Sequence, residues 1–444
     1  MQLIVFSFLA IVLFGAIVLC LPLSSKIGKI SFVDALFTAS SATCVTGLSV
    51  FDTFKTFSIF GQVVILLLIQ LGGLGMITFT TAITLILRKK LDLKELQIAK
   101  EHTSGEAVNI KKLIKTILIC TFFFELLGSG VLCLRFVPQF GLTGIWNALF
   151  MAVSSYCNAG FDILGFLAPN EGSLTFYKTD ALVSITLSLL TIIGGLGFVV
   201  MSDIFTFFYR RIKLKDSSAR LRVHSILVII ATLFLLFFGT VTFMLLEYSG
   251  TLLNLNFFDK LTASFFYSAS TRTAGFFSTP IFFQKTITKI LTMLLMFIGA
   301  SPASTGGGIK TTTLAVLIMS CMCVLKGIED PVIFKHKISK FTVYKALTIL
   351  VLFLLLFFIF SLSIHLIEKS IPFLDVAYEV ISALSTTGLS TGITAKLSVV
   401  SKILICLAIF TGRVGPISLI LSVSLNKSKR GIDKILPDSK IIVG

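Results

Sequence analysis

The stretch Cys44-Val45-Thr46-Gly47-Leu48 closes an apolar, Ser/Thr-rich run that begins at Phe32. The same pattern returns three times, as Asn158-Ala159-Gly160-Phe161, Thr273-Ala274-Gly275-Phe276 and Thr386-Thr387-Gly388-Leu389. The four glycines are separated by 113, 115 and 113 residues. A near-constant period over a whole chain is the signature of internal repeats. We therefore expect four copies of one unit around one axis, each presenting its glycine loop to the centre.

The composition indicates a membrane protein. Of the 444 residues, 55% are apolar and only 13% are charged, and 44 are Phe. Several apolar stretches reach the length of about 18 residues that is typical of transmembrane helices. The fold class that we expect is therefore an all-α membrane protein embedded in the lipid bilayer.

The net charge of +17 is distributed in a way that argues against nucleic acid as a partner. Four short segments, 88–115, 209–222, 326–345 and 426–444, hold 24 of the 38 Lys and Arg residues. Basic residues that cluster at the ends of spans mark the cytoplasmic side. We expect these segments, and both termini, to be cytoplasmic, with binding of lipid headgroups or a partner as a secondary use of the charge.

The sequence offers little for catalysis or for a resident cofactor. The eight Cys and four His residues are scattered, which predicts neither a metal site nor a disulfide framework. Residues 306–311 resemble a phosphate loop but lack its spacing, and no HExxH motif, aspartate dyad or Ser/His pair lies within a span. The first 22 residues lack the basic start of a signal peptide and are expected to remain as a helix. We expect no enzyme activity and no cofactor in this chain.

Each repeat has the same predicted plan, namely a span, a short helix, a glycine loop and a second span that carries glycines. The repeats cover 1–90, 111–210, 222–325 and 341–425, and a polar tail covers 426–444. The short helices, at about 32–44, 144–157, 257–271 and 373–385, cannot cross a bilayer of roughly 30 Å at 1.5 Å per residue. The plan predicts eight transmembrane helices and four re-entrant pore helices, which surround one central pore.

The second spans carry glycines at a roughly fixed distance from the loop glycines. They read Gly72-Gly73-Leu74-Gly75, Gly194-Gly195-Leu196-Gly197, Gly299 to Gly308, and Gly412-Arg413-Val414-Gly415-Pro416. Small residues let membrane helices pack closely, and we favour this role for the first two groups. Residues 299–308 contain four Gly and one Pro, which is poor helix material and suits a segment with two arrangements, although a static kink is the alternative.

The four loops have the composition of a cation filter. They contain almost no side-chain charge, so their ligands are carbonyl oxygens, which can replace the hydration shell of an ion, helped by the hydroxyls of Thr46, Thr273, Thr386 and Thr387. Glycine adopts positive φ, which a β-branched residue does not do cheaply. The short helices direct their partly negative ends inward. The predicted filter residues are Val45, Thr46, Gly47, Asn158, Ala159, Gly160, Thr273, Ala274, Gly275, Thr386, Thr387 and Gly388.

Two other interpretations account for some of these features. A single glycine loop is more often a turn or a close packing contact, but four copies at one period favour a filter. A secondary transporter with broken helices is the more serious alternative, because such folds also place irregular backbone in the membrane. Those folds contain two repeats of several spans, so the fourfold period favours a pore.

The fourfold plan and its loop motifs resemble the Trk/Ktr/HKT superfamily of potassium transporters. Residues Ile298-Gly299-Ala300-Ser301-Pro302-Ala303-Ser304-Thr305 resemble in particular the membrane subunits of bacterial Ktr systems. The resemblance implies potassium uptake across the bacterial cytoplasmic membrane, often sodium-dependent, by a homodimer with one pore per subunit. It also implies a cytoplasmic, KtrA-like ring of RCK-type regulatory subunits, which would carry any ATP, ADP or NAD.

The resemblance further implies an intramembrane gate in the third repeat and a basic residue of the last span below the filter. The gating loop corresponds to Gly299, Ala300, Ser301, Pro302, Ala303, Ser304, Thr305, Gly306, Gly307 and Gly308, and the basic residue corresponds to Arg413. A charge near the middle of a membrane is costly, so Arg413 should face water or a partner rather than snorkel to the interface. Lys310 could lie near Arg413 or toward the cytoplasm, and the sequence leaves both positions open.

Overall fold

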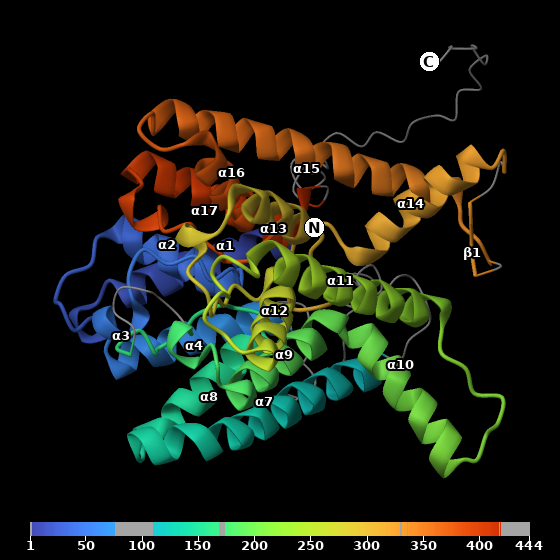
Figure 1. The fold of residues 1–444 in the computed structure, drawn as a ribbon, viewed down its shortest axis with the longest axis horizontal. Coiled ribbons are helices and arrows are strands. Elements are labelled where there is room, and N and C mark those ends of the chain that lie inside the picture. The colour runs from blue at the N-terminus through green and yellow to red at the C-terminus, as the bar shows by residue number, and fades with distance from the viewer. Residues whose placement is uncertain are drawn as a thin grey trace.

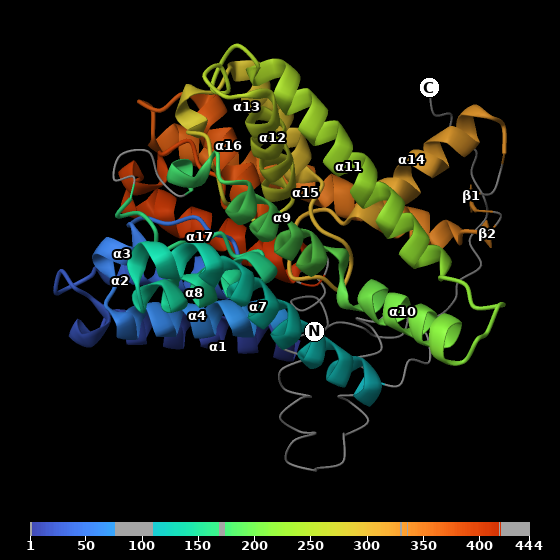
Figure 2. The ribbon, with the colours of Figure 1, turned by 60° about the horizontal axis from the view of Figure 1, so that its bottom comes forward.

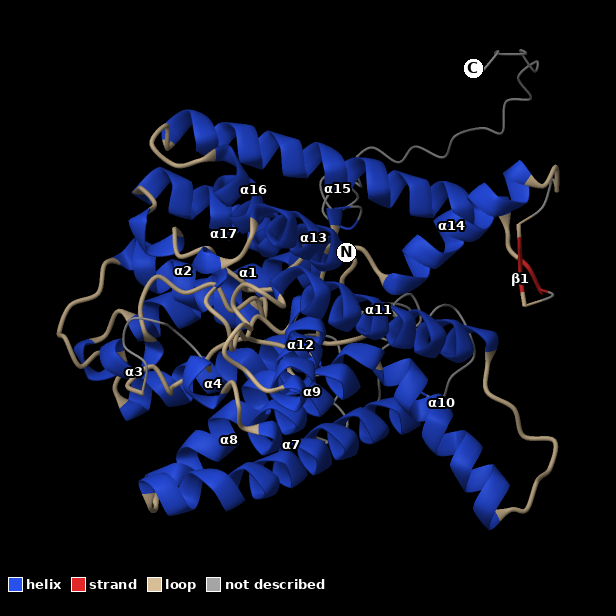
Figure 3. Ribbon diagram, viewed as in Figure 1, coloured by secondary structure: helices blue, strands red, loops and turns tan. Residues whose placement is uncertain are grey.

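The computed structural model is built almost entirely of helices (Figures 1 and 3). It describes residues 2–75, 110–167, 174–328, 331–334, 336–416 and 418. The predicted tail 426–444, the end of the first repeat and residues 168–173 of the segment after Gly160 lie outside these residues. A short antiparallel pair, β1 (Val332–Ile333) and β2 (His336–Lys337), is the one departure from an all-α fold within the described chain.

We call the described helices that fall within each of the four expected repeats a unit. The first half contains α1 (Gln2–Leu19), α2 (Phe32–Thr43), α3 (Thr53–Thr56), α4 (Ile59–Leu74), α7 (Ile110–Phe140), α8 (Thr143–Tyr156), α9 (Ala181–Leu196) and α10 (Phe198–Phe208), which continues into a π-helical turn, Tyr209–Lys213. The second half contains α11 (Val223–Glu247), α12 (Phe257–Thr271), α13 (Thr286–Phe297), α14 (Thr311–Leu325), α15 (Lys340–Ile367), α16 (Phe373–Leu384) and α17 (Val399–Val414). Short 3-10 turns occupy Pro22–Ser24, Thr175–Tyr177, Ile281–Phe283 and Thr394–Lys396.

Helices α2, α8, α12 and α16, which we call the short helices, begin and end within one residue of their expected ranges. Polar residues fix the starts of several helices in this fold. Side-chain oxygens of Ser31, Ser58, Asp180 and Ser398 accept hydrogen bonds from backbone N–H groups in the first turn of α2, α4, α9 and α17. Such caps satisfy N–H groups that have no partner inside the helix.

The contacts between units close a cycle. Each short helix packs against the helices before and after it in its own unit, such as α2 against α1 and α4. Each also packs against the second helix of the preceding unit: α8 against α4, α12 against α9, α16 against α13, and α2 against α17. The loops that follow the short helices gather in the centre, enclosed by the helices (Figure 3).

Three described helices, α7, α11 and α15, are long and apolar enough to cross a membrane. The pair α9 and α10 passes the same test together, but it is bent by 95° at Gly197. The sequence analysis assigned Gly194–Gly197 to close packing within one span, whereas the structure ends a helix there. Four shorter apolar helices lie within other expected spans. The total of eight spans stays a prediction.

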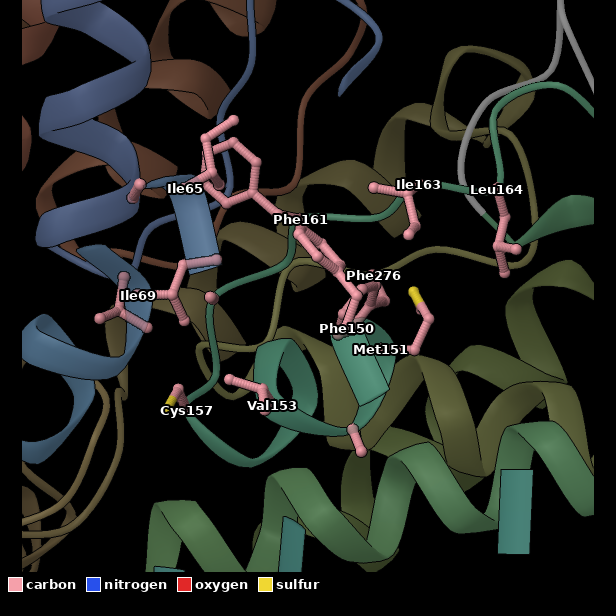
Figure 4. Close-up of a cluster of buried hydrophobic side chains, with 14 of the residues drawn as sticks. Ile65, Ile69, Phe150, Met151, Val153, Cys157, Phe161, Ile163, Leu164 and Phe276 are labelled. Carbon is pink, nitrogen blue, oxygen red and sulfur yellow. The ribbon is translucent and has the colours of Figure 1, made fainter. Parts of the chain in front are cut away.

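The largest buried apolar cluster joins the first and second units to the centre of the fold. Figure 4 shows Phe161 and Phe276, which directly follow two of the loop glycines, lying among Ile65, Ile69 and Phe150. All five side chains are at most 2% exposed. The glycine loops are therefore supported from behind by packed side chains, which hold irregular backbone in place.

Candidate functional site

The structure brings the four loop glycines together in a closed ring. A methyl group built on Gly47 would lie 3.0 Å from the α-carbon of Gly160, and one on Gly160 would lie 3.1 Å from that of Gly275. A methyl group on Gly275 would lie 3.2 Å from the α-carbon of Gly388, and one on Gly388 would lie 2.9 Å from that of Gly47. In each case the carbonyl oxygen before the neighbouring glycine is nearer still. Only a residue without a side chain fits these four positions, which we call the ring glycines.

Each ring loop has a second left-handed residue two positions before its glycine. These residues are Val45, Asn158, Thr273 and Thr386, with φ of 56°, 58°, 76° and 51°. The ring glycines themselves have φ between 69° and 94°. Positive φ is expected at glycine because β-branched residues adopt it only at a cost, yet three β-branched residues adopt it here. Such a conformation costs on the order of 1–3 kcal/mol per residue and persists only where the surrounding structure enforces it.

Serine residues near the end of each short helix hold the ring loops, and the sequence analysis did not assign them this role. Ser41 and Ser382 accept hydrogen bonds from the N–H groups of Gly47 and Gly388 at 3.1 and 3.0 Å. Ser154 and Ser270 donate to the carbonyl oxygens just beyond the other two ring glycines. The signal was present in the sequence, because a Ser stands five or six residues before every ring glycine.

The predicted filter hydroxyls have different partners. Thr387 shares a hydrogen bond of 2.8 Å with Ser385, and Thr386 accepts one of 2.9 Å from the N–H of Gly307. Thr46 is fully buried, and its hydroxyl has no hydrogen-bond partner within the described part of the protein. Thr273 accepts a hydrogen bond of 3.5 Å from Asn158. Three of the four hydroxyls are therefore engaged by neighbouring protein groups, which leaves the carbonyl groups as the abundant ligands of the ring.

One charged residue adjoins a ring loop. Arg272 directly precedes Thr273 and is buried, with 7% of its surface exposed. Its Nη2 lies 3.4 Å from the hydroxyl of Thr232 on α11, so the guanidinium is directed to that helix. The loops thus keep the low side-chain charge that the sequence indicates at the ring itself.

The predicted gating segment lies against the ring residues of the third and fourth units. Ile298 and Ile309 form a parallel bridge at the base of the loop, which we call loop 298–310. Within the loop, Gly307 donates to Thr386, and an added methyl group on Gly308 would lie 3.3 Å from the β-carbon of Ser385. Loop 298–310 therefore contacts the backbone that carries the ring.

The same loop is joined to the second unit by backbone hydrogen bonds. The N–H of Ser301 donates to Gly195 O at 3.1 Å, and the N–H of Thr305 donates to Gly194 O at 3.4 Å. In the other direction, the N–H of Phe198 donates to Ala303 O at 2.8 Å. These three bonds place the loop at the junction of α9 and α10.

Two cationic side chains donate to carbonyl groups beside the ring. Arg413 donates from Nη1 to Thr305 O and from Nη2 to Gly72 O, which joins α17 to loop 298–310 and to α4. Lys310 donates from Nζ to Gly306 O at 2.7 Å. The structure thus places Lys310 on the loop beside the ring, which decides between the two positions that the sequence left open. No ion pair with a carboxylate involves either side chain within the described ranges.

The ends of the short helices determine the electrostatics at the ring. The described residues contain no group of three or more His, Cys, Asp or Glu residues that could hold a metal ion. The short helices end at Thr43, Tyr156, Thr271 and Leu384, directly before the ring loops. Helix C-termini carry partial negative charge, which favours a cation at the ring.

Comparison with known proteins gives consistent matches over nearly the whole chain. A family model described as "TrkH: Cation transport protein" matches residues 7–431. The chain is 37% identical over 447 residues to a protein of Bacillus subtilis (strain 168) named "Ktr system potassium uptake protein B", covering 100% of this chain and 96% of that one. It is 36% identical to "Potassium/sodium uptake protein NtpJ" of Enterococcus hirae, covering 100% and 97%.

The fold is similar to that of a solved structure, the potassium transporter TrkH from Vibrio parahaemolyticus. The TM-score is 0.73, and the match covers 95% of this chain and 84% of the other. Because the sequence identity is 17%, this likeness concerns the fold alone.

Proposed function

Since this chain belongs to the TrkH family of cation transport proteins, we propose that it takes up potassium ions through a pore at the ring glycines. The observation that carries the proposal is the closed ring formed by four loops that lie more than 100 residues apart in sequence. Irregular backbone is tolerated at membrane depth where it is buried in protein or lines a water-filled path. Such backbone, placed around one axis, supplies the geometry that a pore needs.

The selectivity filter in this proposal consists of the carbonyl oxygens of residues 45–47, 158–160, 273–275 and 386–388. Rings of carbonyl groups replace the water around a potassium ion. The serine bonds support this role. They hold the loops in one shape despite the free-energy cost of the positive φ at the left-handed residues. The four loops differ in side chains, so the filter is less regular than one made of four identical loops.

The gate in this proposal is loop 298–310 together with Arg413. Arg413 lies near the ring, where a partly buried positive charge repels a passing cation and its guanidinium binds loop carbonyls. Lys310 adds a second positive charge on the same loop. Residues 299–308, with four Gly and one Pro, suit a segment that leaves this position when the path opens.

The wider assembly that we propose follows from the family. The relatives named as Ktr system proteins support a role as the membrane subunit of a multi-subunit system. We propose a homodimer in a bacterial cytoplasmic membrane, with cytoplasmic termini and a regulatory ring of RCK-type subunits that binds ATP, ADP or NAD. The relative named as a potassium/sodium uptake protein supports a dependence of transport on sodium.

Ion flux with the purified protein tests this proposal. We expect ⁸⁶Rb⁺ uptake into proteoliposomes to persist without a counter-ion gradient, and potassium to compete with it better than sodium. A rate above about 10³ ions per second, the upper range of typical turnover numbers, favours a pore over an alternating transporter. The assay is run with and without sodium and with and without a co-purified soluble subunit. Absence of flux under all four conditions contradicts the proposal.

A further inference from the structure

The bend between α9 and α10 frees backbone groups that a continuous helix would pair. In an unbroken α-helix, the N–H of Phe198 would donate to Gly194 O and the N–H of Val199 would donate to Gly195 O. The 95° bend prevents both bonds, because Gly197 adopts φ 92° and ψ 142°. Groups at such a helix end need other partners, since unpaired buried backbone is costly.

Loop 298–310 supplies those partners. Gly194 O and Gly195 O accept from the N–H groups of Thr305 and Ser301, and the N–H of Phe198 donates to Ala303 O. The loop therefore uses the same atoms that a straight helix would use for itself. The N–H of Phe198 has one hydrogen to donate, so docking of the loop and continuity of the helix compete for it, while Gly194 O and Gly195 O accept from the loop in place of the donors of a straight helix.

We propose that the junction of α9 and α10 is a two-state switch, bent while loop 298–310 is docked and straight when the loop leaves. Two packings that exchange the same hydrogen bonds differ little in free energy, which is the property of a switching element. The inference rests on the proposed function in one respect, because it takes the loop to be the gate. The exchange of hydrogen bonds itself does not depend on which ion passes.

Helix α10 connects the bend at Gly197 to an exposed end of the molecule, so a displacement of that end can change the bend. Phe198 anchors its start in a small cluster with Leu74 and Ile117. Beyond that point α10 leaves the main helix bundle (Figures 1 and 2) and ends in the exposed basic turn Tyr209–Lys213. An ion pair of 3.6 Å between Asp203 and Arg222 links α10 to the start of α11. A force on this end of α10 acts directly on the bonds that hold the loop.

The chain contains matched controls for this switch. Gly75 and Gly415 end α4 and α17 with φ of 76° and 87° and ψ of 141° and 136°, close to the values at Gly197. Among the described residues, a methyl group on Gly75 would meet nothing within 4 Å, and one on Gly415 only a serine hydroxyl at 4.0 Å. On Gly197 it would lie 2.5 Å from Pro302 O. The Gly→Ala change therefore strains the backbone at all three positions, but only at Gly197 does it also displace loop 298–310.

The experiment measures the bend by pulsed electron paramagnetic resonance. Spin labels replace Ile185 on α9 and Phe208 on α10, which are 40% and 53% exposed, in a background whose eight cysteines are substituted. With a rise of 1.5 Å per residue, their backbone separation is about 23 Å for the 95° bend and about 35 Å for a straight helix. The labelled protein is compared as wild type, with residues 300–305 deleted, as Gly197→Ala and as Gly415→Ala.

We expect the deletion and Gly197→Ala to move the population toward the longer distance, and Gly415→Ala to leave it unchanged. Gly197→Ala should also raise basal ⁸⁶Rb⁺ flux by about fivefold, the factor by which Ala exceeds Gly in helix preference. An unchanged distance in both the deletion and Gly197→Ala overturns the switch, whatever the flux. A longer distance with no rubidium flux in any variant supports the switch and contradicts the proposed function, so the two failures are separate.

Discussion

The four units contribute both to the ring and to the adjacent layer, where second helices contact the ends of short helices. The four units make equivalent contacts in the ring, but they do not in the adjacent layer. Every ring glycine lies against the next one in the same way. In the adjacent layer, three second helices place a glycine directly against the last carbonyl of a short helix, whereas the third unit does not. The three pairs are Gly72 with Thr43 O, Gly194 with Tyr156 O, and Gly412 with Leu384 O.

The exception is Gly299, which lies against Gly307 and Gly308 of its own loop. Helix α13 ends at Phe297, and the chain turns back on itself before α14 begins at Thr311. Loop 298–310 therefore takes the place that a second helix occupies in the other units. The units are therefore equivalent where we propose that ions are selected, and they differ where we propose that the path closes.

The largest expected effect tests the equivalence of the ring. Substitution of any one ring glycine by Ser should lower the preference for rubidium over sodium by about a hundredfold, because each position combines a positive φ with a neighbour too close for a side chain. Competition of Na⁺ with ⁸⁶Rb⁺ uptake measures it. Gly130→Ser is the control, since a side chain there meets nothing within 4 Å in the part of the chain that the structure describes. A ring position that tolerates Ser would break the equivalence.

The next prediction concerns the layer beside the ring. Gly412→Ala should destabilise the protein by about 2 kcal/mol, because the methyl group meets the backbone carbonyl of Leu384, which cannot move away. Gly299→Ala should cost less and raise basal flux instead, because its neighbours belong to a loop that can be displaced. Thermal unfolding in detergent and rubidium flux are measured for both variants. Equal loss of stability without any rise in flux for Gly299→Ala would contradict the distinction.

The sequence predicts the ring because its period survives in every unit. Four glycines at a spacing of 113–115 residues identify the loops, and their short helices follow with ends correct to one residue. Close packing was also the correct interpretation for Gly72 and Gly194. These features depend on local pattern, which one sequence displays directly.

Other features depend on tertiary contacts, many of them with another unit, and could not be predicted from the sequence. Gly194 and Gly197 belong to one motif, but the first is a packing contact and the second ends a helix, because loop 298–310 pairs with the freed backbone. Val45 and Thr386 adopt positive φ against their own preference, because the surrounding loops enforce it. The position of Lys310 likewise depends on the fold of its loop. None of these outcomes follows from spacing alone.

A smaller effect is expected where the exceptional loop is tied to the other units. Arg413→Ala removes the bonds to Thr305 O and Gly72 O and should raise basal rubidium flux about fivefold to tenfold, on the order of 1–1.4 kcal/mol. Arg413→Lys is the matched control, because it keeps the charge but cannot reach both carbonyls with one ammonium group. An increase with Ala and an intermediate value with Lys would separate charge from tethering. Identical flux in all three proteins would remove Arg413 from the gate.

The units also differ at the far ends of the second helices, ten residues before the glycines of the adjacent layer. Lys402 pairs with Asp34 at 2.7 Å, and Lys289 pairs with Asp375 at 3.1 Å, each joining a second helix to the short helix of the next unit. At the corresponding position Gln62 accepts a hydrogen bond of 2.9 Å from the Trp146 indole. In the second unit the position holds Ser184, which donates to Tyr177 O instead. We call the contact between a second helix and the short helix of the next unit a seam. The seam between the second and third units thus lacks a side-chain bridge at this position, and it is the seam at which loop 298–310 docks.

The smallest predicted effect tests whether these side-chain bridges stabilise the contacts between neighbouring units. In a double-mutant cycle, Lys402→Met and Asp34→Asn should show a coupling of about 1 kcal/mol, because the two side chains are only 12% and 16% exposed and are screened less than a surface pair. Lys55 and Asp52, at 4.0 Å and 49% and 29% exposed, should show a coupling near zero.

The complementary experiment adds an ion pair between the second and third units, by Ser184→Lys with Thr262→Asp. This pair should lower basal flux if the seam between these units moves with loop 298–310. Coupling no larger than the Lys55 control, or an unchanged flux in the bridged variant, would mean that the seams are equally stiff and that the asymmetry of the molecule is confined to loop 298–310.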